Sequence, residues 1–259
     1  MRKEVFFSLV LVFGLSTYAL TASSADVSVL IERAKKGEAD AQFGLAEAYR
    51  KGDGLPKSNA EAAQWYRKAA EQGVAEAQST LGHLYREGEG VRKNSAEAVK
   101  WYRQAAEKGD ANAQISLGKM YRAGEGVPKN SAEAAKLYRQ AAEKGNADAQ
   151  VGLGRMYRAG EGVPKNSAEA AKWYRMAAEQ DVVEAQTDLG LMYANGQGVD
   201  RDYVEAVKWY RKAAEQGDAK AQNGLGVMYH NGFGVEQDEK ESRKWFRKAA
   251  EQGYYGKAR

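Results

Sequence analysis

The sequence predicts an all-α protein, an α/α solenoid of six 36-residue helix-turn-helix repeats preceded by a half repeat. The dipeptide Ala-Gln recurs every 36 residues, at 41–42, 77–78, 113–114, 149–150, 185–186 and 221–222. A fixed period between about 20 and 50 residues is typical of solenoids and repeat arrays. No stretch of sequence alternates apolar and polar residues as a strand does. The repeated part of the chain is therefore expected to be helical throughout.

Residues 1–25 are expected to be a signal peptide. Arg2 and Lys3 precede an apolar run at 5–20, and small residues follow at 22–25. A basic start, an apolar stretch and a small-residue cleavage site are typical of secretory signals. The alternative is an uncleaved membrane anchor, for which the run is short. We expect cleavage after Ser24 or Ala25, a periplasmic or secreted protein, and no stable membrane insertion afterwards.

Each repeat is expected to form two amphipathic helices. In the third repeat, Ala113, Leu117 and Met120 share one face of a helix over about 111–122. A second helix is predicted from about 130 to 144, and glycines close both helices because glycine readily adopts the left-handed conformation. A helix at 26–37 is expected to cap the N-terminal end, and 254–259 form a tail that breaks the pattern. The six repeats are placed at 38–73, 74–109, 110–145, 146–181, 182–217 and 218–253.

Two recurring features predict how the helices start and pack. A capping residue stands three positions before a glutamate in every second helix, as in Ser58 and Glu61, which predicts the reciprocal hydrogen bonds of a capping box. Gly82 and its equivalents lie inside the first helices, where glycine costs about 1 kcal/mol relative to alanine. We therefore expect close helix–helix approach at these glycines. Trp-Tyr pairs such as Trp101-Tyr102 have core spacing and are expected to be core rather than a sugar-binding platform.

Composition excludes several classes of function. The chain has 259 residues, 39 Lys+Arg, 35 Asp+Glu, two histidines and no cysteine. A net charge of +4 with interspersed signs does not by itself indicate nucleic acid or anionic membrane. Without cysteine there is no disulfide, thiolate metal site or cysteine nucleophile. His83 and His230 stand at different positions of distant repeats, so we expect no shared metal site. We also expect no cofactor and, from the charge balance, no nucleic-acid partner.

Two short motifs carry little weight as catalytic or nucleotide sites. Ser116 and Lys119 match the S-x-x-K motif of penicillin-interacting enzymes, but K-T-G and S-D-N are missing. The G-x-G-V stretches lack the preceding strand and third glycine of a nucleotide fingerprint. We interpret the first as helix surface and the second as helix-ending turns.

The repeat pattern A-Q-x-x-L-G-x-M-Y-x-x-G-x-G-V-x-x-N-x-x-E-A-x-x-W-Y-x-x-A-A-E-x-G resembles the Sel-1-like repeat family over residues 38–253. That resemblance implies a right-handed α/α superhelix related to tetratricopeptide repeats. It also implies a protein-interaction scaffold, in bacteria often exported and linked to the cell envelope, signalling or host contact. Some secreted relatives with a cysteine pair per repeat are linked to β-lactam binding or hydrolysis, and this chain has no cysteine.

The first helices are expected to carry the partner-binding surface. Helical geometry places positions 43, 47 and 50, and their equivalents, opposite the core face, where a solenoid presents its concave surface. Exposed apolar residues together with arginines are typical of such a surface. The alternative is that this face is partly buried between repeats, with arginines paired to loop acids such as Glu89 or Glu125. The predicted partner-binding residues are Phe43, Arg50, His83, Arg86, Ile115, Lys119, Arg122, Val151, Arg155, Arg158, Leu191 and Val227.

The sequence therefore predicts an exported, non-enzymatic scaffold for a protein or peptide with acidic and apolar residues. A first alternative is a peptidoglycan- or polysaccharide-binding envelope protein, for which Phe43 and the tail tyrosines are the candidate aromatics. A second is a β-lactam-interacting serine hydrolase that uses Ser116.

Overall fold

A computed structural model of the chain describes residues 24–256. The predicted signal peptide lies outside this range except for Ser24 and Ala25, which begin the first helix. The described residues form thirteen α-helices and no strand, which confirms the all-α prediction. The helices are α1 (Ser24–Lys35), α2 (Ala39–Lys51), α3 (Asn59–Glu71), α4 (Ala75–Glu87), α5 (Ser95–Glu107), α6 (Ala111–Ala123), α7 (Ser131–Glu143), α8 (Ala147–Ala159), α9 (Ser167–Glu179), α10 (Val183–Asn195), α11 (Tyr203–Glu215), α12 (Ala219–Asn231) and α13 (Glu239–Glu251).

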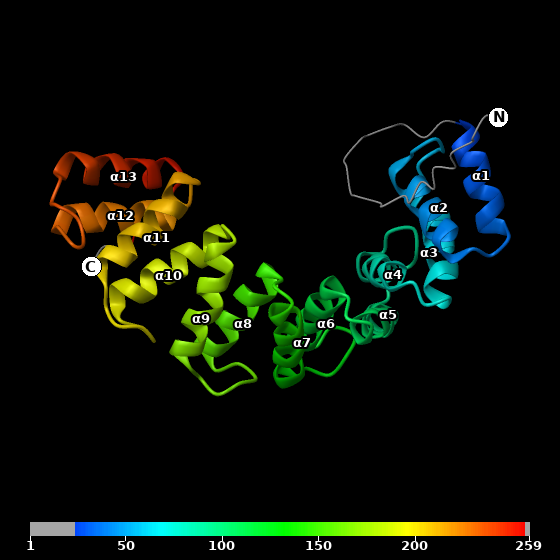
Figure 1. Ribbon diagram of the computed structural model, residues 1–259, viewed down its shortest axis with the longest axis horizontal. Helices are drawn as coiled ribbons and strands as arrows, with labels where there is room; N and C mark the ends of the chain where they lie inside the picture. Colours follow the sequence, from blue (N-terminus) through cyan, green and yellow to red (C-terminus); the bar gives the residue numbers. More distant parts are fainter. Residues whose placement is uncertain (1–23, 257–259) are drawn as a thin grey trace, which may run out of the picture.

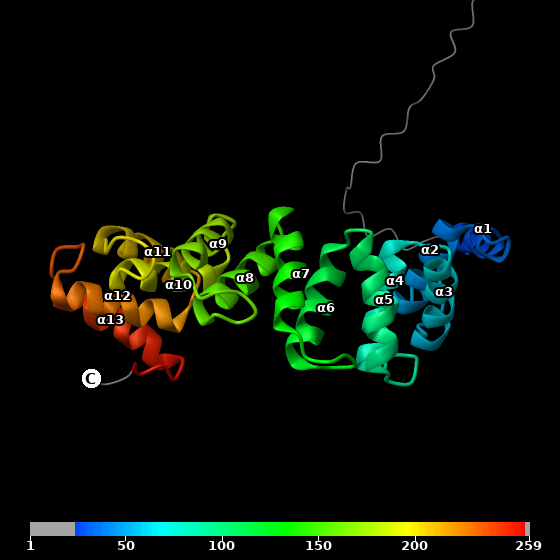
Figure 2. The same ribbon diagram turned by 90° about the horizontal axis from the view of Figure 1, so that it is seen from below.

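The helices stack in chain order into one curved array. Each helix packs against the helix before it and the helix after it. Figures 1 and 2 show the array running from α1 at one end to α13 at the other, curved so that its two ends rise on the same side in Figure 1. The first helices of neighbouring repeats also touch directly, α4 with α6 and α10 with α12. The even-numbered helices therefore line the inner side of the curve.

The capping prediction is half right. The side chain of Ser58 accepts a hydrogen bond from the backbone N–H of Glu61, and the capping Asn or Asp of the other second helices accepts the corresponding bond. The prediction of a reciprocal bond from the capping residue's N–H to the glutamate side chain is wrong, because that N–H donates to a backbone carbonyl instead. It donates to the carbonyl of a tyrosine in the preceding helix, as from Ser58 to Tyr49 at 2.9 Å. The cap therefore also ties the two helices of a repeat together.

The glycines inside the first helices mark close helix–helix approaches, as predicted, and the structure shows that the neighbouring group is an aromatic ring. A Cβ at Gly190 would lie 2.8 Å from Cδ1 of Tyr210, and one at Gly82 would lie 2.9 Å from the matching atom of Tyr102. Both tyrosines are buried, in keeping with a core role for the aromatic pairs. The ring of Tyr210 also faces the next repeat, since a Cβ at Gly224 would lie 2.9 Å from its Cζ. One ring thus packs between the first helices of two consecutive repeats.

The glutamine of each Ala-Gln pair joins successive repeats, a role that the sequence did not reveal. Gln150 is buried and its Nε2 donates to the carbonyl of Ala142, at the end of α7, at 3.2 Å. Its Oε1 accepts a 2.8 Å hydrogen bond from Gln180 at the end of α9. The same amide-to-carbonyl bond forms at all six repeats, from Gln42, Gln78, Gln114, Gln150, Gln186 and Gln222.

Gly190→Ala is expected to destabilise the protein by about 1–3 kcal/mol, because the new methyl group overlaps the buried Tyr210 ring. This loss runs against helix propensity, which favours alanine by about 1 kcal/mol. Chemical denaturation followed by circular dichroism measures it. Gly44→Ala is the matched control, since its Cβ meets only the flexible end of Leu30 at 3.3 Å. Equal stability of the two variants would contradict this account of the helical glycines.

Candidate functional site

The candidate site is the inner surface, which we define as positions 40, 43, 44, 47 and 50 of α2 with their equivalents in α4, α6, α8, α10 and α12. Each of these positions lies three or four residues from another one in the set, so together they cover one side of each helix. The packing of tyrosines and glutamines between repeats sets the spacing of these helices. The variable side chains of the inner surface are therefore displayed on a repeated frame.

The predicted exposure of Ile115 and Val151 is wrong. Both are buried, with 6% and 5% of their surface exposed, and they share a core cluster with Tyr138. The helical projection treated each first helix as packed on one partner. In the solenoid a first helix contacts the second helices on both sides and can also meet the next first helix, so its buried arc is wider. The remaining predicted apolar residues, Phe43, Leu191 and Val227, are partly buried.

The first two arginines of the predicted set are paired within their own repeat. Arg50 forms an ion pair with Glu47, with 2.7 Å between Nη2 and Oε2, and also donates to the hydroxyl of Tyr66 at 3.1 Å. Arg86 pairs with the adjacent Glu87 at 2.6 Å. Neither ion pair bridges two repeats.

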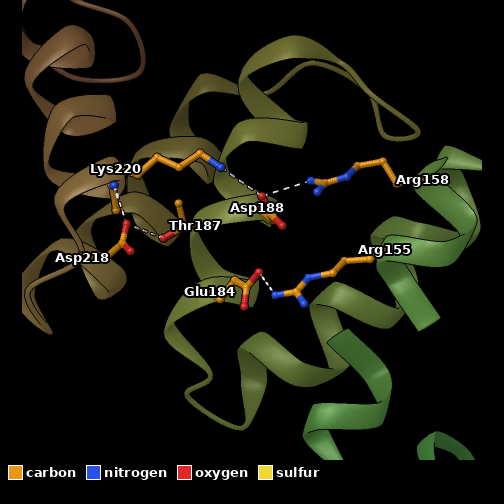
Figure 3. Close-up of polar contacts among 8 residues, drawn as sticks. Arg155, Arg158, Glu184, Thr187, Asp188, Asp218 and Lys220 are labelled. Atoms are coloured by element: carbon orange, nitrogen blue, oxygen red, sulfur yellow. Dashed lines mark hydrogen bonds and ion pairs between the residues drawn. The ribbon is translucent and has the colours of Figure 1, made fainter. Parts of the chain in front are cut away.

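The next predicted arginines cross from one repeat to the following one. Arg122 makes a two-pronged ion pair with Glu161 of the next repeat, at 3.0 and 2.8 Å. Glu161 is the loop acid equivalent to Glu89 and Glu125, so the alternative reading of paired arginines holds here. Figure 3 shows Arg155 reaching Glu184 and Arg158 reaching Asp188, both from α8 to α10.

Asp188 is the centre of a charge network that sequence reasoning missed. Its side chain is only 5% exposed and lies 3.1 Å from Arg158 of α8 and 3.2 Å from Lys220 of α12. One carboxylate therefore links three consecutive first helices. The signal was present in the sequence, since the equivalent positions hold Gly44, Thr80, Ser116, Gly152 and Gly224.

Burial and the charge of Asp188 together raise the pKa values of two buried tyrosines beside this network. Burial raises the pKa of Tyr174 above its ordinary value, and the negative charge of Asp188 raises it further, against the opposing effect of Arg158. Burial and Asp188 raise the pKa of Tyr210 in the same way. Both hydroxyls therefore stay protonated, and at this end of the inner surface ion pairs join consecutive first helices.

An open groove of about 340 Å³ crosses α2, α4 and α6 on the inner surface. It brings together two residues of the predicted set, Arg50 and His83, with several polar residues that were not predicted. His83 and Lys119, which lies one turn beyond Ser116, are exposed and take part in no ion pair within the described part of the chain. The groove is lined by Glu47, Arg50, Ser79, Thr80, His83, Leu84, Glu89, Tyr102, Asn112 and Ser116.

The geometry gives no support to a catalytic serine. Ser116 lines the groove beside the buried Tyr102, and within residues 24–256 it makes no hydrogen bond to Lys119. The glycan alternative also loses its main candidate, since Phe43 packs against Tyr66 with ring centroids 5.8 Å apart. Over the same residues, no group of three acidic or histidine side chains is placed to hold a metal ion. No described helix is long and apolar enough to span a bilayer.

Comparison with known proteins agrees with this architecture. The sequence profile of the Sel1 repeat matches residues 39–74, 75–110, 111–146, 147–182, 183–218 and 219–254. The chain belongs to the Sel1 repeat family. Each matched range begins one residue after our repeat boundary. Sel1 repeat proteins are generally non-enzymatic scaffolds that mediate protein–protein interactions.

Two solved Sel1 repeat structures resemble the chain over most of its length. A Sel1 repeat protein from Oxalobacter formigenes is 38% identical, over 90% of this chain and 95% of that one, with a TM-score of 0.81. A protective antigen of uropathogenic Escherichia coli strains, with the same repeat fold, is 43% identical over 88% of this chain, with a TM-score of 0.84. This chain spans 49% of that antigen's length. A comparison with curated proteins gives no match.

Acid is expected to weaken this Sel1 repeat protein in part through Glu47. Burial acts to raise the pKa of Glu47, but hydrogen bonds from Arg50, Tyr66 and Lys51 outweigh it and lower the pKa from about 4.5 to about 2. Between these values the unfolded chain binds more protons than the folded one. The stabilisation of the folded state by ionised Glu47 is therefore complete above about pH 4.5 and is lost as the pH falls to about 2.

Denaturation of the native protein and of Glu47→Gln across this pH range tests the prediction. The stability difference between them should be largest above about pH 4.5 and shrink toward about pH 2. Glu71→Gln, at an exposed glutamate of α3 with no ion pair among the described residues, serves as the control and should follow the native curve. A constant difference at every pH would contradict the assignment.

Proposed function

We propose that this Sel1 repeat protein is an exported scaffold that holds a partner protein or peptide in the inner groove across α2, α4 and α6. The observation that carries the proposal is the contrast between the two halves of the inner surface. From α8 to α12, three ion pairs join neighbouring repeats: Arg155 with Glu184, Arg158 with Asp188 and Lys220 with Asp188. In the groove, the Glu47–Arg50 ion pair stays within one repeat, and hydroxyl, amide and imidazole groups and the carboxylate of Glu89 border open space.

The chemistry of the groove favours an acidic, hydrogen-bonding segment. His83 lines the groove and the ammonium group of Lys119 lies one turn beyond Ser116 on the same helix, while Ser79, Thr80 and Asn112 can donate and accept hydrogen bonds. Of the two carboxylates in the lining, Glu47 is paired with Arg50. The burial of Ile115 and Val151 removes the main support for an apolar component of the partner. The basic, apolar and small-residue segments at the start of the sequence support export, and an exported scaffold would meet its partner in the periplasm or outside the cell.

Site-specific photo-crosslinking tests the position of the partner. A photoreactive residue at position 83 lies in the groove and one at position 119 is exposed on α6 one turn beyond Ser116, whereas one at position 100 or 136 is exposed on a second helix. Expressed in the source cells, the protein should give a discrete crosslinked product from positions 83 and 119 only. Equal products from all four positions, or products from 100 and 136 alone, would overturn the proposed groove.

A pair of charge-reversing substitutions measures the electrostatic contribution to partner binding. His83→Glu with Lys119→Glu is expected to reduce capture of the crosslinked partner at least about tenfold, because both changes place a carboxylate opposite an acidic ligand. Neither residue belongs to an ion pair among the described residues, so the fold should be kept. Arg92→Glu with Lys129→Glu, in exposed loops, is the control and changes the net charge at least as much. Equal loss in both pairs would indicate a long-range charge effect rather than a groove contact.

A further inference from the structure

Helix α13 differs from the other second helices on the face where a following repeat packs. Arg243 stands where Val99, Ala135, Ala171 and Val207 stand in earlier repeats. Those four residues are at most 5% exposed because the next repeat covers them, whereas Arg243 is exposed. Figure 1 shows α13 at the end of the array, and its packing partner is α12. The outer face of α13 is therefore built for a polar environment.

Arg247 lacks the partner that its equivalents have. In earlier repeats this arginine donates to a tyrosine hydroxyl in the next first helix, as from Arg103 to Tyr121 at 3.2 Å and from Arg211 to Tyr229 at 2.8 Å. Arg67, Arg139 and Arg175 make the same contact. Among residues 24–256 no acceptor is found for Arg247. Within the described residues, the guanidinium of Arg247 is exposed and unpaired.

Four cations form one stripe along α13, which we call the α13 basic stripe: Lys240, Arg243, Lys244 and Arg247. Their spacing of three, four and seven residues puts them on one side of the helix. All four are exposed, and together they line a shallow groove of about 400 Å³. Lys244 pairs with Glu241 at 2.9 Å, and Arg243 donates only to a backbone carbonyl. Lys240 and Arg247 have no acidic partner in the described chain, so the stripe carries excess positive charge.

The make-up of the stripe favours a lipid surface over a protein partner. The centre of a specific protein interface carries aromatic or apolar anchors, and the residues that line this groove are all basic. An anionic bilayer needs only cations, because its negative surface potential attracts each of them. We propose that the α13 basic stripe binds the anionic phospholipid headgroups of a membrane surface. Attachment at this end would leave the groove across α2, α4 and α6 open, and it does not depend on the proposed partner.

Vesicle co-sedimentation tests the proposal. The purified protein should bind vesicles of equal parts phosphatidylcholine and phosphatidylglycerol at low salt. It should not bind phosphatidylcholine alone, and high salt should release it. Replacing Lys240, Arg243, Lys244 and Arg247 by glutamine should lower the partition coefficient at least about tenfold. The control replaces Lys100, Lys136, Lys172 and Lys208 by glutamine, which removes the same charge from four other second helices and should change partition less than about twofold.

Three results would overturn the proposal, provided circular dichroism shows that both variants are folded. They are no binding of the native protein to anionic vesicles, equal partition of native protein and stripe variant, and equal loss in stripe variant and control. An oligo-glutamate peptide is measured alongside. If the native protein binds this peptide but not the vesicles, and the stripe variant binds neither, the stripe is a site for an acidic protein segment.

Discussion

The buried glutamine that opens each repeat is the interaction on which the rest of the structure depends. The carbonyl of Ala142 already accepts a 3.0 Å hydrogen bond from the backbone N–H of Gly145, and its second lone pair can accept another donor. Gln150 supplies that donor from the next repeat and accepts from Gln180 at the end of its own repeat's second helix. One buried side chain thus bonds both to the preceding repeat and to the second helix of its own repeat. The tyrosine rings then fill the space between first helices.

The same frame serves two different ends of the inner surface. Toward the C-terminal half, Asp188 forms ion pairs with Arg158 and Lys220, and these pairs join helices α8, α10 and α12. Toward the N-terminal half, small polar residues at the equivalent positions leave a groove beside His83. The cross-repeat bridge depends on an aspartate at position 188 together with Arg158 on one side and Lys220 on the other. Variation at a few inner positions is therefore enough to place a binding region along an otherwise uniform solenoid.

Features that recur in every repeat could be predicted from the sequence. Features that depend on contacts with helices of other repeats could not. The period, the helix pairs and the close approach at Gly190 follow from one repeat and its neighbours in sequence. The exposure of Ile115 could not be judged from a helical projection, because its burial comes from helices of other repeats. Gln150 was visible as a marker of the period, yet a polar residue at a fixed position does not show which carbonyl it reaches. Asp188 was visible as the odd residue at its position, but its two cations come from repeats on either side.

A double-mutant cycle on Gln150→Ala and Gln180→Ala tests the role of the glutamines most directly. Chemical denaturation of the native protein, both single variants and the double variant gives the coupling between the two side chains. We expect Gln150→Ala to lose about 1–3 kcal/mol, with a coupling of about 0.5–1.5 kcal/mol, because each amide orients the other. Gln64→Ala, at an exposed glutamine of α3, should be close to neutral. Additive effects, with Gln150→Ala no worse than Gln64→Ala, would show that these hydrogen bonds do not hold the repeats together.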